Sequence, residues 1–301
     1  MSHPSMAVRP STESHQAFAC AILAYVMWGL LPLFLKLIAH LPIMEVMTHR
    51  IVWSLPFAGL LLLATDRSGA MGQAIRNPRV LMMACVTSAL ICFNWSTYVW
   101  AIMNGRTLEA ALGYYINPLV SVSLGVVLLH ERLSRAQILA VALAAIAVGL
   151  LSFRAGGVPW ISLALAFSFA FYSYLRKTLP VAALQGFTLE VMILSLPAIA
   201  YLTWLIVSGQ SNFGTANNWD ALLLVISGPA TAGPLILFTI GARKLRMTTL
   251  GILQYIAPTL VFLTAVFGFK EPFSITQAIA FGLIWIGLII FTWSSVVQAR
   301  K

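Results

Sequence analysis

Ten apolar segments follow one another along the chain, and each is long enough to cross a lipid bilayer. A helix of about 20 residues spans the ~30 Å hydrocarbon core of a membrane. Short connections join the segments, so no soluble domain is inserted. Backbone amides find no water inside a bilayer, and segments this long satisfy them as helices rather than barrel strands. We therefore predict an all-α membrane protein with spans at 17–40, 44–65, 79–104, 107–129, 134–153, 158–175, 183–208, 219–242, 247–269 and 275–297.

The composition agrees with a chain surrounded mostly by lipid. Hydrophobic residues make up 60% of the sequence and charged residues only 9%, whereas soluble domains carry about 25% charged residues. The net charge is +10, but the basic residues lie in short connections rather than on one face. The basicity therefore indicates membrane topology, and no nucleic-acid partner is predicted.

The distribution of Lys and Arg predicts the orientation. If the N-terminus is cytoplasmic, thirteen basic residues fall on the cytoplasmic side and three fall outside, as the positive-inside rule requires. Residues 1–16 and 298–301 are then cytoplasmic tails of a multi-pass protein of the bacterial inner membrane. The outside residues are Arg106, Arg154 and Lys270; the inside ones are Arg9, Arg67, Arg76, Arg79, Arg132, Arg135, Arg176, Lys177, Arg243, Lys244, Arg246, Arg300 and Lys301.

An internal repeat with an offset of 140 residues divides the chain into two halves, 17–155 and 156–297. Five spans separate equivalent positions, and an odd number reverses direction, so the halves are predicted to be inverted. Inverted repeats of transporters place a substrate site near the midplane, between the halves. The polar and helix-breaking matches are Arg106 with Arg246, Tyr115 with Tyr255, Pro118 with Pro258, Glu131 with Glu271, Ser134 with Ser274 and Gln137 with Gln277.

Polar and aromatic residues at mid-membrane depth are the candidate substrate-binding residues, because polar groups are costly there unless they face a cavity or a partner. The densest cluster surrounds Pro118, whose ring removes a backbone hydrogen bond, and Pro258 repeats this pattern. We expect both prolines to kink and gate their helices; the alternative is a pair of packing kinks. The candidates, several of which could equally be structural, are Trp28, Asn94, Trp95, Tyr98, Tyr114, Tyr115, Asn117, Tyr172, Thr231, Gln254 and Tyr255.

Charged residues within the spans form a second set of candidates. Glu45 and His49 lie one turn apart, followed by Arg50. They predict either a local salt bridge with a snorkelling arginine or a gating or proton-linked group, since histidine changes charge near neutral pH. Glu190 is either a protonatable coupling site or a carboxylate paired with basic residues at a helix end. Glu131 and Glu271, at the ends of their spans, are expected to be structural.

Several catalytic and cofactor motifs are absent from the sequence. It contains no GxxxxGK[ST] phosphate loop, no HExxH, no GxSxG and no Cys/His cluster with metal-ligand spacing. The three cysteines lie inside apolar segments and are expected to be small buried hydrophobes. We therefore predict no catalytic residue, no metal, no cofactor and no enzyme activity.

Several stretches resemble the drug/metabolite transporter superfamily, and among its EamA-type members the RarD group in particular. They are Thr48–Ser54, Asn94–Trp95, Leu108–Gln137, Leu165–Lys177 and Thr248–Leu263. The resemblance implies a basket in which the first four and the sixth to ninth helices surround a central cavity. It places the fifth and tenth helices at the periphery, where they offer a homodimer contact.

The resemblance also implies transport of small molecules, since relatives export amino acids and other metabolites and the RarD label is associated with chloramphenicol. We predict an alternating-access secondary transporter that exports small organic metabolites or drugs. The alternatives are a proton-coupled importer and a membrane scaffold without transport.

Overall fold

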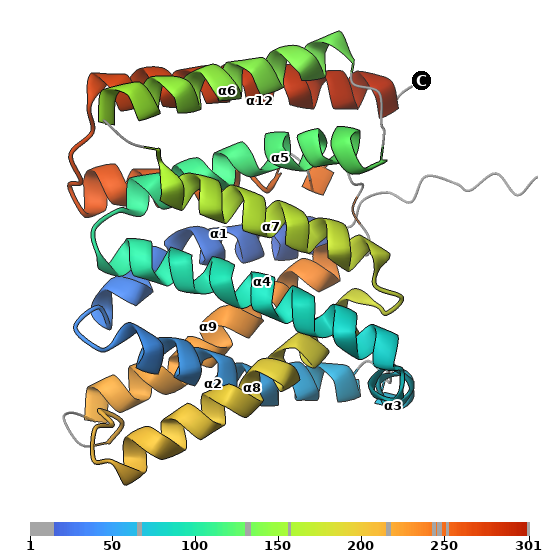
Figure 1. Cartoon of the computed structure of the whole chain (residues 1–301), viewed down its shortest axis with the longest axis vertical. Coiled ribbons are helices and arrows are strands. Elements are labelled where there is room, and N and C mark those ends of the chain that lie inside the picture. Colours follow the sequence, from blue (N-terminus) through green and yellow to red (C-terminus); the bar gives the residue numbers. More distant parts are fainter. Residues whose placement is uncertain are drawn as a thin grey trace, which may run out of the picture.

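The structure, a computed structural model, describes residues 15–64, 68–129, 134–155, 158–214, 218–242, 245, 249–250 and 253–299. Within these residues every regular element is a helix, which confirms the predicted all-α class (Figure 1). The elements are α1 (His15–Leu37), α2 (Ile43–Ala64), α3 (Ser68–Arg76), α4 (Pro78–Met103), α5 (Thr107–Leu129), α6 (Arg135–Ala155), α7 (Trp160–Thr178), α8 (Ala183–Val207), α9 (Asn218–Ala242), α11 (Ile256–Leu263), the π-helix η1 (Thr264–Gly268) and α12 (Ile275–Ala299).

The chain is a multi-pass membrane protein. Seven helices of the described part are long and apolar enough to cross a membrane: α1, α2, α4, α6, α8, α9 and α12. Large apolar side chains such as Phe153 and Val207 are more than 80% exposed, which only a lipid environment stabilises. The segments α5, α7 and α11–η1 coincide with the other three predicted spans, and the total of ten crossings stays a prediction.

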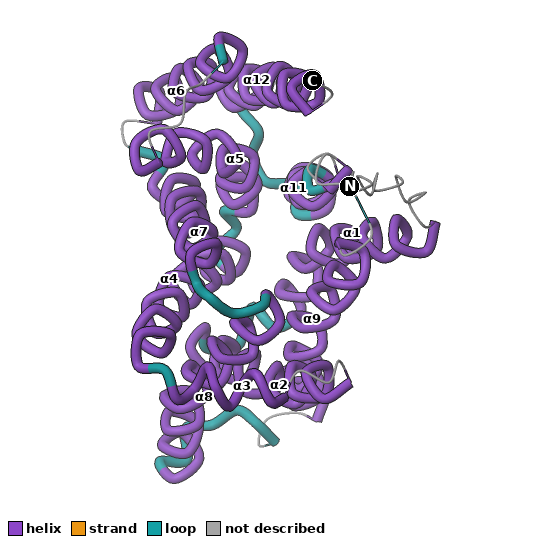
Figure 2. The backbone as a smooth tube through the Cα atoms, turned by 90° about the vertical axis from the view of Figure 1, so that its right-hand side faces the viewer, coloured by secondary structure: helices purple, strands orange, loops and turns teal. Residues whose placement is uncertain are grey.

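Eight helical segments form a closed ring through their principal contacts, in the order α1, α9, α2, α8, α4, α7, α5, α11 and back to α1. Figure 2 shows this ring as two rows, with α5, α7, α4 and α8 in one and α11, α1, α9 and α2 in the other. Neighbours in the ring come alternately from the first and the second half of the chain. The remaining long helices, α6 and α12, pack against each other outside the ring, beside α5.

Two glycines allow ring helices to approach backbone to backbone. A Cβ atom on Gly228 of α9 would overlap the backbone of Trp53 in α2. A Cβ atom on Gly113 of α5 would lie 2.8 Å from the carbonyl oxygen of Ser162 in α7. Small residues at such crossings are typical of membrane helix packing.

A hydrophobic cluster closes one end of the ring, which we call the sealed end. It joins buried residues from six helices, α1, α2, α4, α5, α7 and α9, including Leu35, Ile102, Ile161 and Leu224. At the opposite end, two separate buried clusters are found among the described residues. One lies around α2, α8 and α4 and the other around α9, α1 and α11, so neither spans the ring. The described chain begins and ends at that opposite end (Figure 1).

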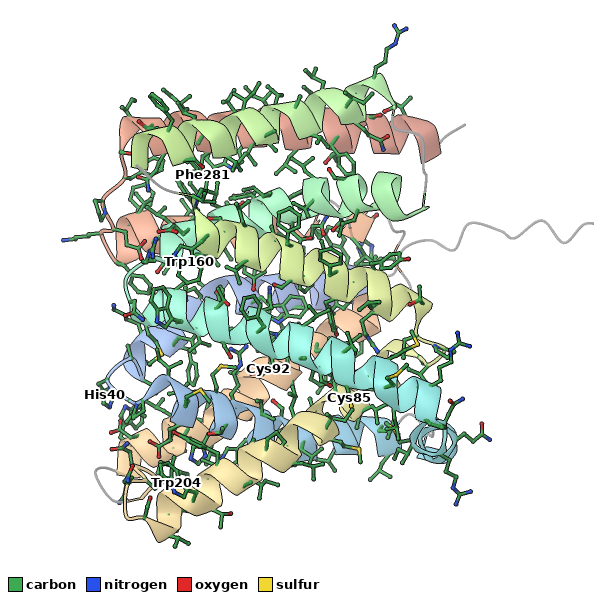
Figure 3. All side chains as sticks on the ribbon, viewed as in Figure 1. His40, Cys85, Cys92, Trp160, Trp204 and Phe281 are labelled. Carbon is green, nitrogen blue, oxygen red and sulfur yellow. The ribbon has the colours of Figure 1, made fainter. Side chains whose placement is uncertain are left out.

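Polar contacts reinforce the sealed end. The Glu45 carboxylate at the start of α2 accepts hydrogen bonds from the backbone N and the side-chain Nδ2 of Asn212, at 2.8 and 2.7 Å. The Glu271 carboxylate accepts from the backbone N atoms of Thr107 and Leu108, at 2.7 and 2.9 Å, where a negative charge suits the first turn of α5. His40, labelled at this end in Figure 3, pairs with Asp220 at 3.1 Å. Glu271 is thus structural, while Glu131 lies outside the described residues.

The two matched prolines lie in different backbone contexts. Pro118 is inside the continuous helix α5, whereas Pro258 is in the first turn of α11, directly after the non-helical turn at Gln254 and Tyr255. The helix thus breaks before Pro258 and restarts at Ile256, and the kinking and gating roles of the two prolines stay predictions. A missing N–H is tolerated in a first turn because no intrahelical bond is due there.

Two other pairs of the 140-residue offset have the same structural role. Ser134 and Gln137 form a reciprocal capping box at the start of α6, with distances of 2.9 and 3.3 Å. Ser274 and Gln277 form the same box at the start of α12, with distances of 2.8 and 3.2 Å. Each box satisfies backbone N–H groups that a helix start leaves free.

Candidate functional site

One buried arginine of α2 lies inside the ring. Arg50 is 4% exposed; its Nε donates a hydrogen bond to Thr231 Oγ1 of α9 at 2.6 Å. Its guanidinium carbon lies 5.4 Å from the ring centroid of Trp95 in α4, within cation–π range. The snorkelling expectation for Arg50 is wrong because the side chain is enclosed, and Glu45 binds the connection between α8 and α9 instead of Arg50.

Two tyrosines complete the surroundings of Arg50. The rings of Tyr98 in α4 and Tyr114 in α5 meet edge to face, with centroids 5.5 Å apart, and both residues belong to the same packed cluster as Trp95. Since α2, α4 and α5 are not neighbours in the ring, these side chains meet across its interior. We call Arg50, Trp95, Tyr98, Tyr114 and Thr231 the Arg50 cluster; all but Arg50 are predicted substrate-binding residues.

A second buried charge, Glu190 of α8, has partners within the protein. Its Oε2 accepts a hydrogen bond from the Tyr172 hydroxyl at 3.0 Å, and its Oε1 lies 3.6 Å from Arg176 Nε. The guanidinium of Arg176 packs against Gly186, where a Cβ atom would overlap it. Of the two interpretations of Glu190, the pairing with a base at a helix end describes its contacts, and a coupling role stays a prediction.

His49 lies between α2 and the connection that follows α8. Its ring stacks on Phe213, with centroids 4.7 Å apart and planes 24° apart. Its Nδ1 accepts a hydrogen bond from Trp53 Nε1 at 3.2 Å, and its buried Nε2 has no hydrogen-bond partner among the described residues. Sequence reasoning missed both contacts: the spacing of four from His49 to Trp53 was an available signal, whereas nothing local marked Phe213.

Two predicted asparagines join helices rather than the Arg50 cluster. Asn94 Nδ2 donates to the carbonyl oxygen of Leu165 at 3.0 Å and to Ser168 Oγ at 2.9 Å, which ties α4 to α7. Asn117 Nδ2 donates to the carbonyl oxygen of Ala166 at 3.4 Å, which ties α5 to α7. Asn94 is fully buried and Asn117 half-buried.

The remaining predicted residues lie in other parts of the ring. Trp28 packs against Tyr25 and Phe238, between α1 and α9. Tyr115 packs against Phe281 and Trp285 of α12, and its hydroxyl is 2.7 Å from Thr259 Oγ1. Gln254 and Tyr255 are half-buried at the turn before α11.

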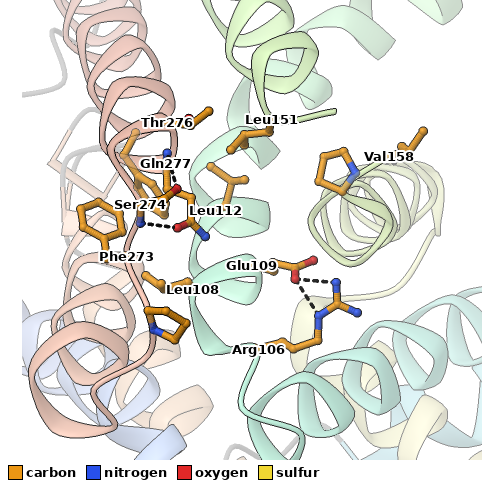
Figure 4. A pocket seen from close by; sticks show the side chains of 13 residues that line it. Arg106, Leu108, Glu109, Leu112, Leu151, Val158, Phe273, Ser274, Thr276 and Gln277 are labelled. Atoms are coloured by element: carbon orange, nitrogen blue, oxygen red, sulfur yellow. Dashed lines mark hydrogen bonds and ion pairs between the residues drawn. The ribbon is translucent and has the colours of Figure 1, made fainter. Parts of the chain in front are cut away.

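A separate cavity of about 780 Å³ lies between α5, α6, α7 and α12 and contains none of the predicted site residues. Arg106 and Glu109, which form an ion pair, stand at its edge (Figure 4). Arg106 also lies 5.9 and 5.8 Å from the ring centroids of Trp100 and Trp160. This arginine is thus satisfied by contacts at the sealed end, unlike Arg50.

The fold and the Arg50 cluster define a polytopic helical membrane protein with a polar centre inside its ring. Residues 16–153 match the EamA-like transporter family. The chain is 44% identical to Protein RarD of Streptomyces exfoliatus, over 92% of this chain and 88% of that protein. It is 41% identical to an uncharacterized transporter of Pseudomonas aeruginosa, over 95% and 96%, and 33% identical to the chloramphenicol-sensitive protein RarD of that organism, over 96% and 97%.

A crystal structure of another protein, 22% identical, superposes with a TM-score of 0.58 over 94% of this chain and 98% of that one, so the two share a fold. The chain belongs to the RarD group of EamA-like transporters in the drug/metabolite transporter superfamily, which confirms the predicted family. The family is one of transporters rather than enzymes.

Proposed function

We propose that this protein is a secondary transporter that exports small organic metabolites or drugs across the bacterial inner membrane by alternating access. One observation carries the proposal: a buried arginine and three aromatic residues from α2, α4 and α5 meet inside a ring whose members alternate between the two halves of the chain. A polar group at this depth is costly unless it serves a cavity or a partner, and a solute is such a partner.

Three observations support ten crossings as two inverted units, 17–155 and 156–297. The ring alternates between the units, the capping boxes of α6 and α12 are equivalent, and the described chain begins and ends at one end of the bundle, as an even number of crossings requires. With the positive-inside bias, that end is cytoplasmic, together with the tails 1–16 and 298–301.

In this proposal the sealed end faces outward and closes one side of the pathway. Export requires the six-helix cluster to separate while the opposite end closes, the exchange that inverted repeats support. The break before Pro258 and the proline inside α5 supply the two unequal hinges. The solute binds at the Arg50 cluster, and Trp28, Asn94, Asn117, Tyr172, Gln254, Tyr115 and Tyr255 shape or line the path.

The partners in this proposal are a small solute and the bilayer, and nucleic acid is not among them. The outer faces of α6 and α12 offer a homodimer contact. The name of one relative, chloramphenicol-sensitive protein RarD, makes chloramphenicol one solute to test, beside amino-acid-like solutes.

Transport by the purified protein in proteoliposomes tests the function directly. Vesicles loaded with labelled amino acids, organic acids, chloramphenicol or a cationic dye should release at least one solute faster than protein-free vesicles. Arg50→Gln should reduce that release, whereas Thr203→Val, at an exposed threonine of α8, should leave it unchanged. If no solute of the panel is released faster than from protein-free vesicles, the result supports the alternative of a membrane scaffold without transport.

A proton-coupled importer is the second candidate function, favoured by the buried carboxylate of Glu190 and by the Nε2 of His49, which has no hydrogen-bond partner in the described part of the chain. Imposing a pH gradient on the same vesicles separates the two. Uptake that follows the gradient and is lost in His49→Gln or Glu190→Gln supports proton coupling. Flux that does not depend on the gradient contradicts proton coupling.

A further inference from the structure

Arg50 is a buried arginine that no acid balances among the described residues. Ion pairs in the described part of the chain join His40 to Asp220, Arg106 to Glu109 and Arg176 to Glu190. Arg50 has no such pair, although it is 4% exposed. An arginine stays protonated inside proteins, and an isolated charge in a low-dielectric interior is strongly unfavourable. The described part of the protein thus holds a buried positive charge without a negative partner of its own.

The hydrogen bonds of Arg50 leave part of its guanidinium without an acceptor among the described residues. Nε is occupied by Thr231 Oγ1 at 2.6 Å, and the Trp95 ring supports the charge at 5.4 Å. The buried Nη1 has no acceptor among the described residues. The Thr231 hydroxyl donates its own proton to the carbonyl oxygen of Ser227 at 2.8 Å, so the contacts that fix Arg50 in the described part of the chain are hydrogen bonds and not an ion pair.

The surroundings indicate what the missing partner looks like. A single guanidinium balances one negative charge, which fits a carboxylate better than a doubly charged phosphate. The aromatic rings of Trp95, Tyr98 and Tyr114 provide apolar surface for the rest of a small molecule. A carboxylate attached to an apolar body matches both features.

We propose that Arg50 binds a carboxylate group of the transported solute. This inference rests on the proposed transport function and adds to it the chemical class of the substrate. Arg50 contacts the carboxylate through Nη1, Thr231 fixes the guanidinium, and the three aromatic residues pack against the apolar part of the solute. An empty site carries an unbalanced charge, so the bound anion removes a cost that the free protein bears.

Binding to the purified full-length protein in detergent tests this without requiring transport. The probes are phenylacetate, indole-3-acetate and benzoate, each compared with its own neutral amide, which keeps the shape and removes the charge. Wild type should bind at least one acid 10-fold or more tightly than its amide. Arg50→Gln should bring that ratio close to one, and Arg50→Lys should keep part of it.

The matched control is Arg106→Gln, which removes another arginine that contacts tryptophan rings but has an acidic partner in Glu109. It should keep the wild-type ratio. The inference is overturned if wild type shows no preference for any acid, or if Arg50→Gln keeps the preference while eluting as a monodisperse protein. The wild-type comparison stands even if the Arg50 variants do not fold.

Two further measurements distinguish a solute from a lipid headgroup as the source of the anion, and transport from carboxylate binding. If phosphatidylglycerol abolishes phenylacetate binding and phosphatidylcholine does not, the partner is a lipid headgroup and the inference fails. If acid binding depends on Arg50 but no flux occurs in proteoliposomes, the proposed transport function is contradicted and the carboxylate site is not. Flux of neutral solutes that Arg50→Gln leaves intact would sink the carboxylate inference alone.

Discussion

Arg50 in α2 and Glu190 in α8 occupy equivalent positions but have opposite surroundings. Glu190 follows Arg50 by 140 residues, the offset of the repeat, and each is the eighth residue of its helix. The two helices pack together and run in opposite directions (Figure 1). Glu190 is held by Tyr172 and Arg176, whereas Arg50 contacts a threonine and an aromatic ring and pairs with no acid of the described residues.

This difference separates a structural charge from a functional one. A buried charge that the protein itself neutralises contributes to packing, and its loss leaves the partner unbalanced. A buried charge that the protein does not neutralise costs stability and persists for another reason, here the binding of a solute. Duplicated halves can thus share a scaffold while only one carries the group that recognises the substrate.

The largest expected effect is on transport through Arg50. Arg50→Gln should lower kcat/KM for a transported carboxylate by about 100-fold, which corresponds to about 2.7 kcal/mol of lost stabilisation. Initial rates in proteoliposomes over a range of substrate concentrations measure it, with Arg106→Gln as the control. A loss of less than threefold would contradict the role of Arg50 in binding the transported solute.

For protein stability the order of the two positions should be reversed: the substitution at Glu190 should cost more than the substitution at Arg50. Glu190→Ala leaves the Arg176 guanidinium without its carboxylate and should cost about 2 kcal/mol, since breaking a buried pair exposes an unbalanced charge. Arg50→Gln removes an unbalanced charge and should leave stability equal or slightly higher. Thermal unfolding in detergent, followed by tryptophan fluorescence, compares them; an equal loss in both variants would mean that Arg50 is as structural as Glu190.

The sequence predicts the helices and the family because these depend on local patterns. Span length, apolar composition and the polar matches at the offset of 140 residues are readable without knowing which helices touch. The surroundings of Arg50 are not, because Thr231 lies 181 residues away and only the ring order brings the two together. Snorkelling was therefore the natural expectation for an arginine near a helix start.

Other differences from the predictions have similar causes. The partner of Glu45 lies in the connection after α8, where no sequence pattern marks it. A proline alone does not distinguish a proline inside a continuous helix from one in a first turn, so the sequence treats Pro118 and Pro258 as equivalent although α5 continues through Pro118 and α11 begins at Ile256, two residues before Pro258. The short helix α3 lacks the length of a span, and its Met71 and Ala74 are buried against α2, α4 and α8.

The contact between Arg50 and Thr231 should have a moderate effect. Thr231→Val removes the acceptor of Arg50 Nε, so the guanidinium is held less firmly and the preference for acid over amide should fall about fivefold, close to 1 kcal/mol. Thr203→Val is the matched control because Thr203 makes the same bond to the carbonyl four residues before it but faces no arginine among the described contacts. An effect of equal size in both would point to the helix backbone rather than to Arg50.

The smallest expected effect concerns the partner of Glu190. Tyr172→Phe removes one hydrogen bond to a carboxylate that keeps Arg176, so stability should fall by about 0.5 kcal/mol, clearly less than in Glu190→Ala. Tyr201→Phe, at a tyrosine of α8 that contacts Trp204, should change it little. In the double variant Tyr172→Phe with Glu190→Ala, the loss should equal that of Glu190→Ala alone, because the hydroxyl has no charge left to bind. Additive losses would show that Tyr172 stabilises α7 independently, and Glu190 would then be less completely satisfied than its contacts indicate.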